Sequence, residues 1–195
     1  MNSIVFATHN RNKLEEIRQM LPPGLKVLSL DAIGCTEEIP ETEDTLEGNA
    51  RLKASYVHEH YGYDCFADDT GLEVAALAGA PGVFSARFAG PQADSGANIR
   101  KLLRLMEDKS DRKARFRTVI ALAVGTDFHL FEGEVEGEIL RQPSGTGGFG
   151  YDPVFRPGGY EQSFAEMPLE EKNRISHRGT AFRKLDSFIR KNLTP

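Results

Sequence analysis

Apolar and polar residues alternate along the chain with two different periods, which together predict a succession of strands and helices. Residues 11–21, for example, place Leu14, Ile17 and Leu21 on one helical face, and Pro22-Pro23-Gly24 ends that pattern. Buried strands are expected where short apolar runs occur. The pattern predicts helices over residues 11–21, 45–61, 95–107 and 181–193, and strands over 3–7, 25–30, 64–67, 114–124 and 127–139.

The order of these elements predicts the fold class. Residues 114–124 and 127–139 are joined by a turn at 125–127 and therefore predict a long antiparallel hairpin. Residues 71–93 are rich in Gly, Ala and Pro, so a folded loop excursion is expected there. We expect an α/β protein with a mixed, elongated sheet and helices packed around it. No linker or repeat divides the chain, which predicts a single domain over residues 1–195.

Composition narrows the range of partners. The 24 Lys and Arg against 29 Asp and Glu give a net charge of −5, which speaks against a nucleic-acid-binding protein but not against small phosphorylated ligands. The two cysteines are too few for a disulfide framework. No secretory signal or apolar run of membrane length is visible, so a cytoplasmic protein without a membrane partner is expected.

The first segment with chemical potential is the polar turn Thr8-His9-Asn10-Arg11-Asn12-Lys13, between a predicted strand and a predicted helix. Free backbone N–H groups at a helix start bind anions, and Lys13 can reach a phosphate. Arg11 and Lys13 oppose the helix dipole, a conflict that a bound anion would remove. The alternative is an ordinary N-cap by Asn10 beside a solvated lysine.

Two adjacent carboxylates, Asp68 and Asp69, follow the predicted strand over 64–67. A strand end is the usual ligand position in an α/β protein, and one or two carboxylates with substrate phosphates typically hold Mg²⁺. Glu41, in the acidic stretch 37–47, is a further candidate metal ligand. The alternatives are a turn capped by aspartate and a solvated acidic loop.

A glycine-dense loop occupies residues 145–150, followed by Tyr151-Asp152-Pro153. Its GxGxxG spacing is not a dinucleotide fingerprint, because Asp152-Pro153 is a poor helix start. Glycines allow close backbone approach, and Phe149 or Tyr151 can stack on a base. The alternative is a flexible loop with core aromatic residues.

The last segment is Ser176-His177-Arg178-Gly179, shortly after Lys172. These side chains can donate hydrogen bonds to carbonyl or phosphate oxygens, although a basic helix entry is the simpler reading. Taken together, the four segments supply phosphate cations, metal carboxylates, a base platform and base-edge donors. They predict a nucleoside polyphosphate site, and no sequence fits a Walker loop.

The same segments resemble the inosine triphosphate pyrophosphatase family, which hydrolyses non-canonical purine nucleoside triphosphates. The resemblance rests on motifs in family order over nearly the whole chain: Thr8-His9-Asn10 with Lys13, Glu41-Thr42, Asn49-Ala50 with Lys53-Ala54, Phe66 to Leu72, Gly79 to Arg87, Gly145 to Pro153, and Ser176 to Gly179. It implies a mixed α/β fold, usually a homodimer, and Mg²⁺-dependent cleavage of ITP, dITP or XTP to the monophosphate and pyrophosphate.

The resemblance also implies roles for individual residues. Asp69 would be the general base and a metal ligand, with Asp68 and Glu41 assisting at the metal. The substrate-binding residues would be Thr8, His9, Asn10, Arg11, Asn12, Lys13 and Lys53 at the triphosphate, with Thr70 beside them, and Phe149, Gly150, Tyr151, Asp152, Lys172, His177 and Arg178 at the base and sugar.

Two positions depart from the family pattern. His9 stands where many members have glycine, which affects the turn at the phosphates, and Gly48 stands where acidic residues are frequent. Donors such as His177 and Arg178 would favour the C6 oxygen of hypoxanthine and xanthine over the amino group of adenine. Other functions remain open: a pyrophosphatase for other modified nucleotides, including pyrimidine nucleotides, or a sensor that binds nucleotides without cleaving them.

Overall fold

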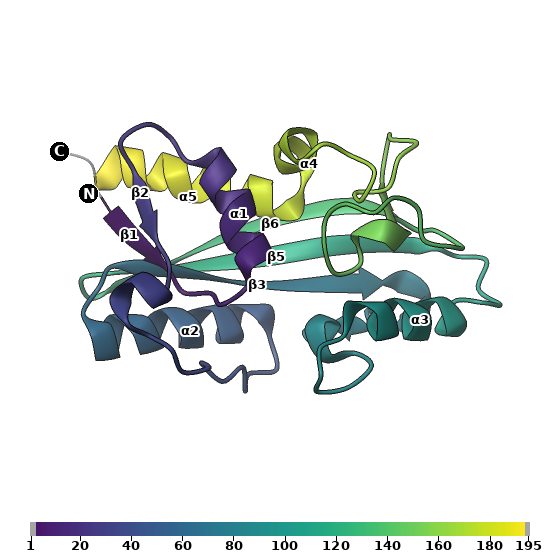
Figure 1. Ribbon diagram of the computed structural model, residues 1–195, viewed down its shortest axis with the longest axis horizontal. Helices are drawn as coiled ribbons and strands as arrows, with labels where there is room; N and C mark the ends of the chain where they lie inside the picture. The colour runs from purple at the N-terminus through teal and green to yellow at the C-terminus, as the bar shows by residue number, and fades with distance from the viewer. Residues whose placement is uncertain (1–2, 194–195) are drawn as a thin grey trace. The chain divides into compact units, whose positions relative to one another are not determined.

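A mixed β-sheet with helices packed around it forms the fold of the computed structural model, which describes residues 3–193 (Figure 1). The strands are β1 (Ser3–Phe6), β2 (Lys26–Leu28), β3 (Cys65–Val74), β4 (Pro81–Gly82), β5 (Lys113–Val124), β6 (Asp127–Ile139) and β7 (Phe155–Pro157). The α-helices are α1 (Arg11–Met20), α2 (Leu46–Tyr61), α3 (Ser95–Leu105), α4 (Leu169–Ile175) and α5 (His177–Asn192), and the short 3₁₀ helices are η1 (Asp31–Ile33), η2 (Ala75–Leu77), η3 (Ser85–Arg87) and η4 (Asp152–Val154).

The strand order is β2-β1-β3-β5-β6-β7, with β4 beside β3. β1 is parallel to β2 and β3, whereas the β3–β4 and β6–β7 pairs are antiparallel. Only Gly125 and Thr126 separate β5 from β6, so these long strands form the expected antiparallel hairpin. The predicted mixed α/β fold is confirmed.

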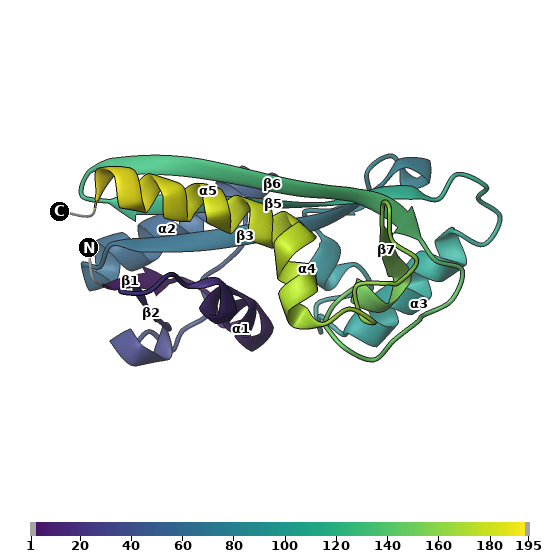
Figure 2. The ribbon, with the colours of Figure 1, turned by 90° about the horizontal axis from the view of Figure 1, so that it is seen from above.

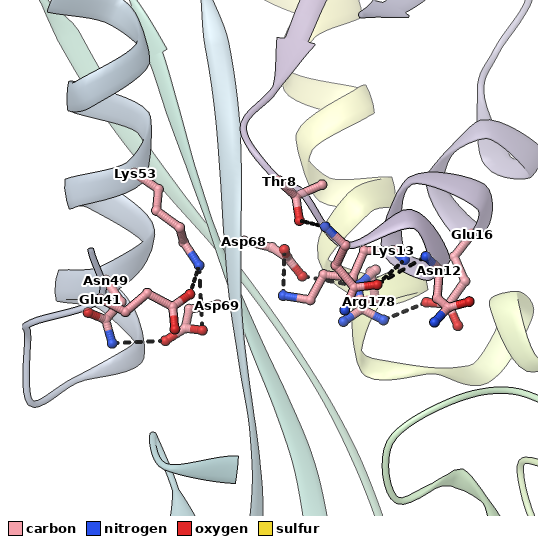
Figure 3. Close-up of polar contacts among 11 residues, drawn as sticks. Thr8, Asn12, Lys13, Glu16, Glu41, Asn49, Lys53, Asp68, Asp69 and Arg178 are labelled. Carbon is pink, nitrogen blue, oxygen red and sulfur yellow. Dashed lines mark hydrogen bonds and ion pairs between the residues drawn. The ribbon is translucent and has the colours of Figure 1, made fainter. Parts of the chain in front are cut away.

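The chain divides into two compact units, and the single domain expected over residues 1–195 stays a prediction. The first unit comprises residues 1–69, 118–133 and 178–195. In it, α2 covers one face of the sheet, and α1 and α5 cover the other (Figures 1 and 3). Ile17 of α1 and Phe182 and Leu185 of α5 pack there on Phe6 and Phe66. Period-two alternation of the strands thus separates two layers of core.

The second unit comprises residues 70–117 and 134–177 and has its own core. Leu102 and Met106, in and just after α3, pack with Phe116 of β5 and Phe155 of β7. Figure 2 shows α3 and β7 of this unit. Among the described residues, no helix is long and apolar enough to cross a membrane.

One predicted boundary is wrong in a way that matters for the site. Strand β3 does not end at Asp68-Asp69 but continues to Val74, so the start of the expected loop excursion is strand. Glycine at position 71 allows β4 to lie close against the extended part of β3, because a Cβ atom at Gly71 would lie only 2.8 Å from the carbonyl oxygen of Gly82 on β4. The two carboxylates therefore point to opposite faces of a strand.

The last helix was also predicted too short, and α4 was missed. Helix α5 begins at His177 rather than near Ala181. Its first turn is polar and includes Arg178, which pairs with Glu16, so the apolar periodicity that marks the rest of the helix does not extend to it. Helix α4 carried recognisable signals: Pro168 precedes it, acidic residues occupy its first turn, and Lys172 and Arg174 occupy its last.

Candidate active site

The centre of the first unit's candidate site is the Asp68-Asp69 pair of β3. Asp68 lies on the same face as Phe66, toward α1 and α5, whereas Asp69 points toward α2 (Figure 3). Both are buried, with 1% and 6% of their surface exposed. The structure thus provides two separate carboxylate environments, one on each face of the strand.

Asp68 is surrounded by cations. Its Oδ1 accepts a hydrogen bond from Lys13 Nζ at 2.9 Å, and its Oδ2 accepts one from Arg178 Nε at 3.0 Å. Arg178 Nη1 also donates to Glu16 Oε2 at 2.5 Å (Figure 3). Burial alone would raise the pKa of Asp68, but Lys13 and Arg178 bring that pKa well below its usual range. Asp68 is therefore held as an anion, suited to positioning cations.

The predicted anion-binding turn is an N-cap whose lysine is not solvated. Asn10 Oδ1 accepts hydrogen bonds from the backbone N–H groups of Asn12 and Lys13, and Thr8 Oγ1 accepts one from Asn10 N. Burial lowers the pKa of Lys13 despite the opposing effect of Asp68. The turn thus brings Lys13 against Asp68, whereas His9, Asn10, Arg11 and Asn12 are exposed.

Asp69 has a different set of partners, from α2 and from the loop that carries Glu41. Its Oδ2 accepts a hydrogen bond from Asn49 Nδ2 at 3.2 Å, and its Oδ1 lies 3.6 Å from Lys53 Nζ. Lys53 also donates to Glu41 Oε1 at 2.5 Å (Figure 3). Burial raises the pKa of Asp69 against the opposing effect of Lys53. A carboxylate with a raised pKa is a better proton acceptor near neutral pH.

The carboxylate oxygens of Asp69 and Glu41 are ligands of the kind that suits a hard divalent cation. Asp69 and Glu41 converge on one positive charge, the ammonium of Lys53, and Mg²⁺ is typically held by one or two carboxylates with substrate phosphates. Asp68 does not join them, because it lies on the other face of β3. Within residues 3–193 no three His, Cys, Asp or Glu side chains are grouped closely enough to hold a metal by themselves.

A further buried ion pair lies in the second unit. Lys172 of α4 donates to Asp152 Oδ2 at 2.5 Å, and both side chains are almost fully buried. The same Asp152 oxygen accepts a hydrogen bond from Phe149 N, and the Lys172 ammonium lies 4.9 Å from the centre of the Phe149 ring. Gly148 has φ +66°, and a Cβ there would lie 2.1 Å from Asp152 Oδ2. The glycine-dense loop therefore wraps around a carboxylate.

The aromatic residues of this loop divide into core and surface. Tyr151 is buried, and its hydroxyl donates to the carbonyl oxygen of Ser85 at 2.9 Å, so its ring serves the core. Phe149 is only half-buried and is the better candidate for base stacking. The ring of His177 stacks on Phe116 at 4.6 Å. Gly150 and Thr70 also belong to this unit.

Two residues of the site escaped the sequence analysis as individuals. Glu16 is the carboxylate partner of Arg178, and Asn49 joins Asp69 to the backbone of Glu43. Glu16 lies one position before Ile17 on α1 and is buried, although it is a charged residue. Its pairing with a residue 162 positions away in the chain has no local signature.

Comparison with known proteins agrees with the predicted resemblance. The family model described as the Ham1 family matches residues 4–188. A dITP/XTP pyrophosphatase from Christiangramia forsetii is 58% identical, with 96% of this chain and 99% of that protein covered, and one from Porphyromonas gingivalis is 55% identical, with 97% and 98% covered. A solved HAM1 protein from Coxiella burnetii shares 40% identity at a TM-score of 0.89, covering 98% of this chain and 100% of that one. The chain belongs to the Ham1 family.

Proposed function

We propose that this protein is a nucleoside-triphosphate pyrophosphatase that hydrolyses dITP, XTP and ITP to the monophosphate and pyrophosphate. The observation that carries the proposal is the 58% identity to a dITP/XTP pyrophosphatase over almost the full length of both chains. The buried, oppositely facing Asp68 and Asp69 environments supply chemistry that fits this activity. Such an enzyme would remove deaminated purine nucleotides from the nucleotide pool.

In the proposed reaction, water attacks the α-phosphorus of the nucleotide. The new bond joins the water oxygen to that phosphorus, the bond to the bridging oxygen of the β-phosphate breaks, and pyrophosphate leaves. Asp69 accepts the proton of the water, a role favoured by the raised pKa of its carboxyl group. Lys53 and Lys13, with the turn from Thr8 to Asn12, stabilise charge on the triphosphate.

We assign the metal site to Asp69 and Glu41, together with phosphate oxygens of the substrate. Mg²⁺ bound there would neutralise charge that develops on the phosphates. Asp68 would contribute from the other face of the strand by keeping Lys13 and Arg178 in place rather than as a direct ligand. This changes the expected role of Asp68.

We assign recognition of the base to the second unit. Phe149 offers an aromatic face, and the buried Lys172–Asp152 pair lies next to it. His177 offers a further polar group, and its ring stacks on Phe116 in the core of the same unit. Arg178 stays a predicted base donor, although two of its nitrogen atoms are engaged with Glu16 and Asp68. The homodimer and the cytoplasmic location also stay predictions, and light scattering of the purified protein tests the first.

Asp69→Asn tests the catalytic assignment. We expect pyrophosphate release from dITP to fall by about a thousandfold, because amide nitrogen and oxygen cannot accept the water proton or hold the metal as a carboxylate does. Asn49 and Lys53 retain an uncharged oxygen partner, so the variant is expected to fold, which a thermal melt checks. Turnover close to that of the unmodified protein would remove Asp69 from the role of general base.

A further inference from the structure

Residues 34–45, which precede helix α2 and include Glu37, Glu41 and Glu43, are called the acidic segment below. A series of side-chain contacts holds this segment along one face of α2. Asn49 exchanges hydrogen bonds with the backbone of Glu43 at 3.0 and 3.2 Å, and Lys53 pairs with Glu41. Positions 49, 53 and 56 are spaced by four and three residues, so they share a helix face. The segment therefore runs antiparallel to α2, with Glu43 near the start of the helix.

The third point of attachment is Glu37, which has no part in the site described above. Its Oε1 accepts hydrogen bonds from the hydroxyl groups of Tyr56 at 2.8 Å and Tyr61 at 2.7 Å, and its Oε2 accepts one from Thr36 N at 3.1 Å. The Tyr61 hydroxyl, with that of Tyr56, lowers the pKa of Glu37 to about 2. The ring of Tyr56 is in turn stacked on His60, with centroids 4.2 Å apart.

The same residue also contacts the turn beside the predicted triphosphate site. His9 Nε2 lies 2.9 Å from the backbone carbonyl oxygen of Glu37 and donates to it when that nitrogen is protonated. The segment is thus attached to α2 by the side chain of Glu37 and to the turn by its backbone.

We propose that Glu37 is a positioning residue, which holds the acidic segment on the Tyr56 and Tyr61 hydroxyl groups so that Glu41 stays beside Asp69. The inference rests on the proposed function of Glu41 and Asp69 as the Mg²⁺ site. Segment 34–45 contains no helix or strand, so side-chain contacts of this kind fix its path. Loss of the Glu37 side-chain contacts would remove one of the attachments that hold the segment carrying Glu41 on α2.

The energy scale determines where the effect should appear. Glu37 is exposed, and interactions of exposed charged groups contribute little to global stability. Residues that orient a metal ligand without touching the metal typically change metal affinity or activity by about 10–100-fold. The consequence of losing Glu37 should therefore be seen in the Mg²⁺ requirement and in local backbone exchange rather than in the melting temperature.

The test compares Glu37→Gln and the double variant Tyr56→Phe/Tyr61→Phe with matched controls. Glu38→Gln removes a neighbouring exposed charge, and Tyr63→Phe removes an exposed tyrosine hydroxyl. Amide hydrogen exchange of residues 37–43 is measured in the metal-free protein, and dITP hydrolysis is measured over a range of Mg²⁺ concentrations. A third variant, Glu41→Gln, tests the metal assignment itself.

The proposal predicts faster exchange at residues 37–43 and an approximately tenfold higher Mg²⁺ concentration for half-maximal activity in both test variants. At saturating Mg²⁺ the turnover should return to within about twofold, because the catalytic groups remain. The controls should match the unmodified protein. If the test variants match the controls in exchange, the positioning role is wrong. If exchange is faster but the Mg²⁺ requirement is unchanged, Glu41→Gln identifies the failure: an unchanged requirement in that variant too refutes the metal site, whereas a raised requirement refutes the positioning role.

Discussion

At the scale of single residues, the site depends on charges that are buried because each has a specific partner. Arg178 is 2% exposed, and burial alone would lower the pKa of its guanidinium, but Glu16 and Asp68 raise that pKa further above its usual value. Removing one partner from such a group leaves a buried charge uncompensated, which costs more than the pair contributes. Glu16 is therefore expected to be essential for the local structure around Asp68.

Glu16→Gln should lower the free energy of unfolding by about 3 kcal/mol, because it removes the negative charge that faces the buried Arg178. Glu15→Gln, at the exposed neighbouring position of α1, is the matched control and should change stability by less than about 0.5 kcal/mol. Urea unfolding of the two variants measures both values. Equal stability of the two variants would show that Arg178 does not depend on Glu16.

Residue types in the site could be predicted from sequence better than their partners. The Asp68-Asp69 pair, Lys13 and the Gly145 to Pro153 loop were all singled out as chemically unusual. The opposite orientations of Asp68 and Asp69 follow from strand periodicity, but the predicted strand ended at Ala67 and so did not include them. The pairing of Arg178 with Glu16 and Asp68 could not, since it joins residues more than a hundred positions apart.

At the scale of secondary-structure elements, amphipathic periodicity and capping residues located most of the structure. Helix α2 was predicted over residues 45–61 and is observed over Leu46–Tyr61, with Thr45 as its N-cap. Helix α4 and strands β4 and β7 are short, and their two to seven residues give too little periodicity. The path of the acidic segment was also beyond prediction, because it is set by contacts with α2.

The contact between this segment and α2 should depend on pH through Glu37. Its folded-state pKa of about 2 lies below the ordinary value of 4.5. The ionised carboxylate therefore stabilises the fold above about pH 4.5, and this contribution is lost as the pH falls toward about 2. Glu37→Gln lacks that dependence.

Urea unfolding of the unmodified protein and Glu37→Gln between about pH 5 and about pH 3 measures this effect. The difference in unfolding free energy between them should be largest at the upper end and shrink as the pH falls. A constant difference for Glu37→Gln would contradict the hydrogen bonds from Tyr56 and Tyr61.

At the scale of the whole molecule, each compact unit carries one kind of chemistry. The first unit holds the carboxylates and cations assigned to the metal and triphosphate, and the second holds the glycine-dense loop and the buried Lys172–Asp152 pair assigned to the base. The net charge of −5 averages over these groups, so it speaks against a nucleic-acid-binding protein without excluding a triphosphate ligand. Ham1 family membership connects both sets of residues to one activity.

The most direct test of the proposed function is pyrophosphate release from a panel of nucleotides, dITP, XTP, ITP, dATP, dGTP and dTTP, with Mg²⁺ and with EDTA. Hydrogen-bond donors facing the C6 oxygen discriminate against adenine by about tenfold to a hundredfold per mismatched group. We expect release from dITP, XTP and ITP to exceed release from the canonical nucleotides strongly and to stop in EDTA. Equal rates on canonical nucleotides would contradict the specificity, and no release from any nucleotide would indicate a non-catalytic sensor.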